Sequence, residues 1–254
     1  MIARGLALLA LAACGTTGGE LVTFDVAAAG PPSAAGAGFA IDNGLGWHVV
    51  LDRAVLHVGA IYLNLSVPSS GAQSTSCILP GVYTAQALAG RDVDVLSPLP
   101  QAFPAPGSGT DDAARAAEIW LTGGDVNAAI DPTVVADLAG TASRDASTIA
   151  FSARITIGNN RLIPTGDPAQ PSMHPICKQR IVSPIALDEL RPRDGDTLML
   201  RIDPTGWFAN VDFTGVAPSA ALPDDLSTPT SQNLFSGLRA STSYTFTFIE
   251  RTSE

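Results

Sequence analysis

Along most of the chain, apolar and polar residues alternate in short runs, and clusters of Gly, Pro, Asp and Ser separate these runs. A period of two predicts half-buried β-strands, whereas the spacing of an amphipathic helix is nearly absent. Short strands at close intervals are typical of an all-β sandwich or barrel. Ten segments are expected to be strands: residues 20–27, 38–42, 47–51, 54–65, 118–122, 148–157, 181–187, 197–202, 208–213 and 243–250.

This number of strands suits two stacked sheets. The fold class we expect is therefore all-β, an antiparallel β-sandwich with long Pro/Gly-rich loops and one short helix. The long loops are residues 97–109 and 163–175, which are rich in Pro and poor in alternation. The sequence has no internal repeat and no clear linker, so residues 20–254 are expected to form a single domain.

The short helix is expected over residues 111–117. Thr110 can accept a hydrogen bond from a free backbone N–H at its start. Asp111 and Asp112 would lie in its first turn, where the helix dipole favours negative charge.

The start of the chain has the features of an export leader. Arg4 supplies positive charge, an apolar run over residues 5–11 follows, and small residues precede Cys14. Leu11-Ala12-Ala13-Cys14 resembles the bacterial lipobox. The resemblance implies a lipoprotein signal peptide over residues 1–13, and a lipidated cysteine with a short tether over residues 14–19. An ordinary secretory leader is the alternative, and both interpretations export the chain.

Composition and charge limit the classes of binding partner that this chain could have. The formal net charge is −10, with 14 Lys and Arg against 24 Asp and Glu and no basic cluster, which excludes a nucleic-acid partner. No later run reaches the roughly 20 apolar residues that a membrane-spanning helix needs. We therefore expect attachment to the cell envelope through the N-terminal lipid, with other envelope proteins as further partners. Gly15 follows the cysteine where inner-membrane retention calls for Asp, so the lipobox resemblance implies the outer membrane.

Two cysteines remain if Cys14 carries lipid. Cys77 and Cys177 would lie in a compartment where disulfides persist, so they are expected to pair. The bond would close a loop of about 100 residues, for which the chain-entropy model gives about 4.7 kcal/mol of stabilisation. The alternative is two separate buried thiols.

Two histidines lie close together in an apolar segment. If Asp52-Arg53 forms a two-residue turn, His48 lies directly opposite His57, with Cβ atoms about 4.5–5.5 Å apart. Two neutral imidazoles at that separation could share a copper or zinc ion. If the segment is one continuous strand, the odd spacing places them on opposite faces. Asp-Arg is a poor sequence for a tight hairpin turn, and hydrogen-bonded surface histidines are the alternative to a metal site.

A third histidine, His174, follows Met173. Imidazole and thioether are ligands that suit copper, especially Cu(I) for the sulfur. These two residues are therefore further candidate ligands for a copper or zinc site.

The sequence gives less support to an enzymatic activity, to calcium binding or to carbohydrate binding. The chain has no Gly-x-Ser-x-Gly elbow and no phosphate-binding Gly-rich loop, so we do not expect an enzyme. Asp203, Asn210 and Asp212 could supply hard oxygen ligands for calcium, but the segment lacks the spacing of a calcium loop, and a turn at Asp203-Pro204 that buries Trp207 and Phe208 is the favoured interpretation. A calcium-stabilised carbohydrate-binding module would need exposed aromatic residues on one face, and only 6% of residues are aromatic.

The strand pair within residues 48–65, and the later run Leu198-Met199-Leu200-Arg201-Ile202-Asp203 followed by Trp207-Phe208, resemble the methanobactin-associated periplasmic copper-binding β-sandwich proteins. The resemblance covers about a quarter of the chain. It implies a β-sandwich and favours copper as the metal, and it assigns no functional residue.

Two functional hypotheses follow. The first is a non-catalytic envelope lipoprotein, a binding or structural β-sandwich module at the membrane surface. The second is a periplasmic or surface metal-binding protein that uses His48 and His57, with His174 and Met173 as further ligands.

Overall fold

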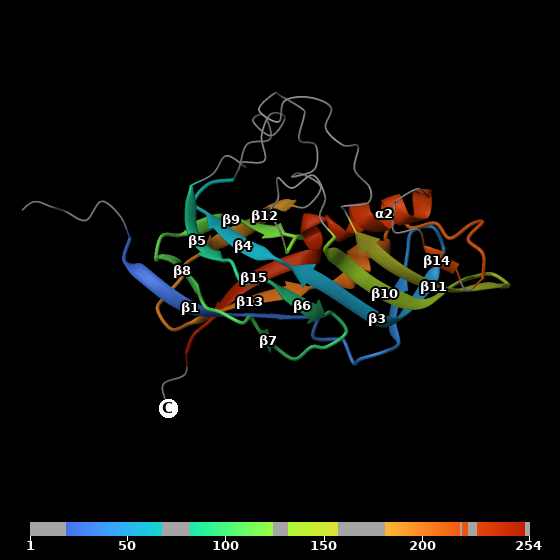
Figure 1. Cartoon of the computed structure of the whole chain (residues 1–254), viewed down its shortest axis with the longest axis horizontal. Coiled ribbons are helices and arrows are strands. Elements are labelled where there is room, and N and C mark those ends of the chain that lie inside the picture. The colour runs from blue at the N-terminus through green and yellow to red at the C-terminus, as the bar shows by residue number, and fades with distance from the viewer. Residues whose placement is uncertain are drawn as a thin grey trace, which may run out of the picture.

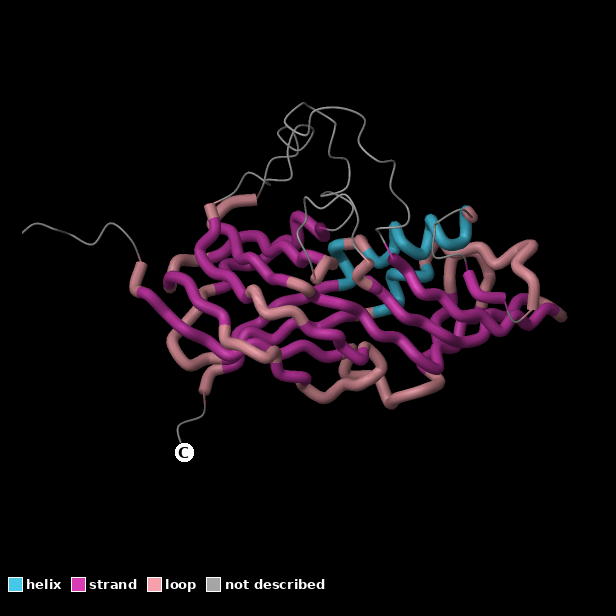
Figure 2. The backbone as a smooth tube through the Cα atoms, in the orientation of Figure 1, coloured by secondary structure: helices cyan, strands magenta, loops and turns pink. Residues whose placement is uncertain are grey.

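Fifteen strands in two sheets account for most of the computed structural model, which describes residues 19–67, 82–123, 132–156, 181–218, 220–222 and 228–251 (Figure 1). Figure 2 shows how far strands outnumber helices in the described residues, with the helical turns gathered on one side of the molecule. The all-β fold class is confirmed. Nearly all strand pairs are antiparallel, and the exceptions are two parallel pairs, β1 with β13 and β11 with β14.

The larger sheet has nine strands and the smaller sheet has six. In spatial order, the larger sheet contains β12 (Ile181–Leu190), β9 (Ala114–Trp120), β4 (Ala60–Asn64), β5 (Tyr83–Ala87), β8 (Gly107–Thr110), β1 (Leu21–Ala29), β13 (Thr197–Ile202) and β15 (Tyr244–Ile249), with β7 (Gln101–Ala102) paired to β1. The smaller sheet contains β14 (Ala220–Leu222), β11 (Ser147–Thr156), β10 (Val134–Arg144), β3 (His48–Val58) and β2 (Phe39–Asp42), with β6 (Arg91–Asp94) paired to β3.

Strand β1 illustrates why these segments fold as they do. Val22, Phe24 and Val26 alternate with polar residues and point into the core, where both sheets contribute to one cluster of buried side chains. In β13, whose bounds agree with the predicted segment 197–202, Leu198, Leu200 and Ile202 point into this cluster and Met199 is buried on the other face. Burial of these alternating apolar side chains is the main favourable term that holds the sheets together.

Strand β3 crosses the smaller sheet and contains a β-bulge. Arg53 pairs with Ala139 and Leu51 pairs with Gly140, so Asp52 is an extra residue in the strand. The bulge breaks the period of two once. As a result the apolar residues on both sides of it face the core: Val49, Leu51, Ala54, Leu56 and Val58.

The expected helix over residues 111–117 is wrong. Residues from Ala114 onward form β9, which pairs with β4 on one side and β12 on the other. Asp111 accepts a hydrogen bond from the backbone N–H of Glu20 instead of lying in a helical turn. Pairing on both sides satisfies the backbone of this Ala-rich run, and that tertiary term outweighs helix propensity.

The α-helix of the described residues is α2 (Pro229–Leu238). Thr228 caps it, Ser231 completes a capping box and Pro229 occupies the first turn. The helix packs on a 3-10 helix, η3 (Pro204–Phe208), so closely that a Cβ on Gly237 would lie 2.1 Å from the carbonyl oxygen of Trp207. No described helix is long and apolar enough to cross a lipid bilayer.

Residues 208–213, expected as a strand, form no strand. Phe208 ends η3, and Phe208, Val211 and Phe213 are fully buried. These apolar side chains fill the core from an irregular segment. Their spacing in the sequence resembles that of a strand, which explains the wrong prediction.

Several sequence predictions lie outside the described residues. They are the signal peptide, the lipidated Cys14, the disulfide between Cys77 and Cys177, and the candidate ligands Met173 and His174.

The turn between β2 and β3 depends on the side chain of Asn43. Its Nδ2 donates hydrogen bonds to the carbonyl oxygens of Phe208 and Val211, at 3.1 and 2.8 Å. Its Oδ1 accepts from the backbone N–H groups of Leu45 and Trp47, both at 3.0 Å. One amide therefore ties the hairpin to the segment that fills the core.

We expect Asn43→Ala to lower the free energy of unfolding by about 3 kcal/mol, because it leaves four backbone groups without their partner. Leu45→Ala is the matched control: this side chain, in the same turn, is 44% exposed and should change stability by less than about 0.5 kcal/mol. Urea unfolding followed by tryptophan fluorescence measures both. Equal effects of the two substitutions would contradict the role of the amide.

Candidate functional site

A row of hydrogen-bonding side chains crosses five strands of the larger sheet. Glu118 on β9 pairs with Tyr62 on β4, and Tyr62 pairs with Gln86 on β5. Gln86 pairs with Ser108 on β8, which pairs with Thr23 on β1. Directly opposed residues on neighbouring strands point to the same face, so these five side chains project together. We call them the polar row.

The polar row lies on the outer face of the sheet. The neighbours of Tyr62 along its strand, Ile61 and Leu63, belong to the buried core. Ile119, next to Glu118 on β9, and Phe24, next to Thr23 on β1, also belong to this core. Because successive side chains of a strand alternate between faces, the polar row points away from the core.

Three aromatic side chains lie on the same face. The ring of Tyr62 is 4.9 Å from the ring of Tyr83 and 4.9 Å from the ring of Trp120, measured between centroids. The interplanar angles are 49° and 45°, so the rings are tilted rather than stacked flat. Tyr83 remains 40% exposed. These three residues form a continuous group, here called the aromatic strip.

The carboxyl group of Glu118 is buried beside the aromatic strip. It accepts hydrogen bonds from Trp120 Nε1 at 3.5 Å and Ser183 Oγ at 3.3 Å, and Tyr83 also contributes a hydrogen bond. None of the ion pairs among the described residues includes it. Burial raises the pKa of Glu118, and the three hydrogen bonds offset this rise in part.

The neighbouring tyrosines respond to the same environment. Burial raises the pKa of Tyr83 to about 12, and the nearby negative charge of Glu118 adds to the effect. Burial and Glu118 likewise raise the pKa of Tyr62. Both phenols are therefore neutral hydrogen-bonding groups throughout the physiological pH range.

Asn64 is a second buried polar residue on this face. It follows Tyr62 by two positions, pairs with Ala116 across to β9, and is fully buried. Neither its Nδ2 nor its Oδ1 has a hydrogen-bond partner. A buried polar group without a partner costs about 1–3 kcal/mol, so its retention in this position calls for an explanation other than stability.

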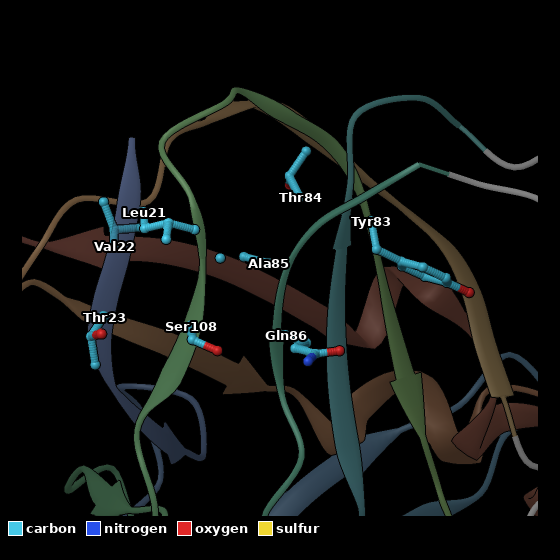
Figure 3. Close-up of a pocket in the computed structure, with 9 residues that line it drawn as sticks. Leu21, Val22, Thr23, Tyr83, Thr84, Ala85, Gln86 and Ser108 are labelled. Carbon is cyan, nitrogen blue, oxygen red and sulfur yellow. The ribbon is translucent and has the colours of Figure 1, made fainter. Parts of the chain in front are cut away.

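A hollow of about 430 Å³ adjoins the aromatic strip. Tyr83 lies on one side of it, Leu21 and Thr23 lie on the other, and Gln86 and Ser108 lie between them (Figure 3). None of the described residues that line this hollow is charged. The hollow and the exposed members of the polar row therefore form one surface that runs from β4 to β1, and Glu118 on β9 lies buried beside it.

The histidines predicted as metal ligands lie on the smaller sheet. β3 is a single strand, so the hairpin interpretation is wrong and His48 does not face His57. Nine positions at about 3.3 Å per residue separate them by roughly 27–30 Å. The expectation of opposite faces is also wrong, because the bulge at Asp52 returns both side chains to the outer face. An ion shared by these two residues is thereby excluded.

Each histidine instead faces an aspartate on the adjacent strand. His48 Nδ1 lies 2.7 Å from Asp42 Oδ1, and His57 Nδ1 lies 2.7 Å from Asp92 Oδ1. The side chain of His48 is 49% exposed, whereas that of His57 is 17% exposed and its Nε2 is buried without a partner. A Cβ on Gly123 would lie 3.1 Å from that Nε2. The described residues contain no group of three or more His, Cys, Asp or Glu suited to a metal ion.

The candidate calcium ligands are occupied by protein donors. Asp203 Oδ1 accepts from the backbone N–H of Thr205 and caps η3. Asp212 Oδ1 accepts from Trp47 Nε1 and from the N–H and hydroxyl of Thr214, and these bonds lower the pKa of Asp212. Both carboxylates thus serve local structure, as the turn interpretation of this segment predicts.

Comparison with known proteins yields one weak similarity. The chain matches no protein-family model and no curated protein. Among solved structures it is similar to MbnP from Methylosinus trichosporium, with 12% sequence identity and a TM-score of 0.39 over 91% of this chain and 99% of that chain. A similarity this weak carries no argument, so the resemblance of the sequence to methanobactin-associated proteins stays a prediction.

Sequence reasoning missed the polar row and the aromatic strip. One signal was present: Glu118 is a single acid in the apolar run Ala116-Ala117-Glu118-Ile119-Trp120, and a period of two places it on the same face as Trp120. The other members come from β4, β5, β8 and β1, whose order in the sheet does not follow their order in the chain. Only the strand register brings them together.

We expect Glu118→Gln to become relatively more stable than the native chain as pH rises from 4 to 8. The folded state holds the pKa of Glu118 above its unfolded value of about 4.3, so the unfolded state releases the proton first. The stability of the native chain is therefore greatest below the unfolded pKa and falls as pH rises through the folded pKa, whereas Gln does not ionise.

Urea unfolding of both proteins at pH 4, 6 and 8 measures the difference. Glu118→Ala is the control, because it removes the hydrogen-bond acceptor and should be destabilising at pH 4 already. If the stability of Glu118→Gln minus that of the native chain stays constant or falls as pH rises, the pKa of Glu118 is not raised.

Proposed function

We propose that this chain is a non-catalytic binding module whose ligand surface is the outer face of the larger sheet. One observation carries the proposal: Tyr62, Tyr83 and Trp120 pack together on that face, beside the buried Glu118. The core needs none of these side chains, since it lies on the opposite face of the sheet.

The position of the aromatic strip supports binding. Aromatic side chains dominate the energetics of recognition surfaces, because each offers a large apolar area with few rotatable bonds. The strip is built on regular, paired strands, which hold side chains more precisely than loops do. A rigid aromatic surface with adjacent hydrogen-bonding groups is the usual composition of a small-molecule site.

For the location, we propose that the module is attached to the bacterial envelope by lipid on Cys14. The support is the leader and the Leu11-Ala12-Ala13-Cys14 motif in the sequence. A short tether would hold the binding face close to the membrane surface.

The proposal predicts that the leader-free protein co-sediments with isolated cell envelopes of its own bacterium. Tyr83→Ala combined with Trp120→Ala should reduce the bound fraction at least tenfold at equal concentration, because it removes the aromatic contact area. Leu45→Ala, an exposed apolar side chain in the hairpin of the smaller sheet, is the control and should bind as the native chain does. Circular dichroism checks that each variant is folded. Unchanged sedimentation of the double variant would refute the assigned face.

A second candidate function is metal binding at His57, and one observation favours it. Asp92 orients the imidazole through Nδ1, which leaves Nε2 as the free ligand atom, the arrangement common among metal-binding histidines. The described residues supply no further ligands, so they do not by themselves form a copper or zinc site. His174 and Met173 stay candidates from the sequence.

Metal titration separates this candidate from the first. For a site at His57, stoichiometric binding of Cu(I) or Zn(II) is lost in His57→Ala and retained in His48→Ala. The two histidines are a matched pair, because both lie on β3 and both face an aspartate. Equal binding by both variants and the native chain would exclude His57 as a ligand.

A further inference from the structure

The outer face of the larger sheet points to one chemical class of ligand, and this inference rests on the proposed function. We propose that the ligand is an uncharged oligosaccharide, whose sugar rings lie along the polar row and against the aromatic strip.

The groups of the polar row match hydroxyl-rich ligands. The amide of Gln86 and the hydroxyls of Ser108, Thr23 and Tyr62 each both donate and accept hydrogen bonds. A sugar hydroxyl also donates and accepts, so each of these side chains can pair with it in either direction. Fixed charges, by contrast, offer only one role.

The aromatic strip matches the other feature of a sugar ring. A pyranose presents a face of C–H groups that carries slight positive charge, and the face of an aromatic ring carries negative charge. Tyr83 is the most favourable contact, because it is 40% exposed and lines the hollow next to Gln86. Gln86 and Ser108 of the polar row line the same hollow as Tyr83.

The charge of the hollow disfavours charged ligands. None of the described residues that line it is Lys or Arg, and the chain carries a net charge of −10, so an anionic polymer would be repelled. None of these lining residues is Asp or Glu either, so a cationic ligand would find no charged partner among them.

The size of the surface indicates more than one sugar ring. Glu118 is fully buried, so the accessible part of the polar row runs from Tyr62 to Thr23 over four strands, and three strand spacings of about 4.8 Å give roughly 14 Å. The hollow of about 430 Å³ lies within the range of small-molecule sites and occupies only the part of the row from β5 to β1. The remaining part, at Tyr62 beside the aromatic strip, is available for a further ring.

The test is calorimetric titration of the leader-free protein with four neutral hexasaccharides, namely cellohexaose, chitohexaose, laminarihexaose and maltohexaose, beside an anionic oligogalacturonate of equal length. We expect at least one neutral hexasaccharide to bind, with affinity reduced at least tenfold in Tyr83→Ala and in Gln86→Ala. Leu45→Ala should bind as the native chain does. Gln86→Glu should also bind more weakly, since it keeps the size and adds a charge.

The outcomes separate this proposal from the proposed function. If no neutral hexasaccharide binds while envelope sedimentation still depends on Tyr83 and Trp120, the saccharide is wrong and the binding face stands. If no neutral hexasaccharide binds and envelope sedimentation does not depend on Tyr83 and Trp120, both the saccharide ligand and the binding face are wrong. Tighter binding of the oligogalacturonate, or saccharide binding that survives Tyr83→Ala and Gln86→Ala, would overturn the assignment of an uncharged ligand to this face.

Discussion

The aromatic segment after β13 links every layer of the molecule. Phe208 and Phe213 lie 5.9 and 5.0 Å from Phe151 on the smaller sheet, and Phe213 lies 5.5 Å from Trp47. Trp207 packs directly under α2. The segment leaves the larger sheet and fills the space beneath the smaller one, so burial of these rings joins the two sheets. The Asn43 amide fixes its backbone, which makes one polar side chain part of the same constraint.

Because this packing lies inside the molecule, the side chains on the outer face of the larger sheet take no part in joining the two sheets. Its members nevertheless include features that cost stability, namely the buried Glu118 and the unsatisfied Asn64. The smaller sheet contains a comparable group in His57, whose Nε2 is buried without a hydrogen-bond partner among the described residues. His48 differs, because it pairs with Asp42 on the adjacent strand and is half exposed, which is the ordinary arrangement of a surface histidine.

The sequence could predict those parts of the fold that depend on local alternation. Residues 197–202 agree with β13 because Leu198, Leu200 and Ile202 alternate toward the main core, although Met199 between them is also apolar and buried on the other face. The failures have physical causes that lie elsewhere in the chain. Residues 111–117 read as a helix, yet pairing with strands on both sides decides their conformation. The spacing of His48 and His57 implies opposite faces only for a regular strand, and the bulge at Asp52 cannot be seen before its partner strand is known.

The aromatic strip shows that a candidate binding surface is also hard to predict from the sequence alone. A content of 6% aromatic residues counts against a saccharide-binding surface when composition is considered alone. A binding surface, however, depends on local density, and three rings suffice when the register places Tyr62 between Tyr83 and Trp120. Those three residues are far apart in the chain and lie on three adjacent strands. Since register is set by long-range pairing, the ligand surface of such a sheet becomes visible only once the order of its strands is known.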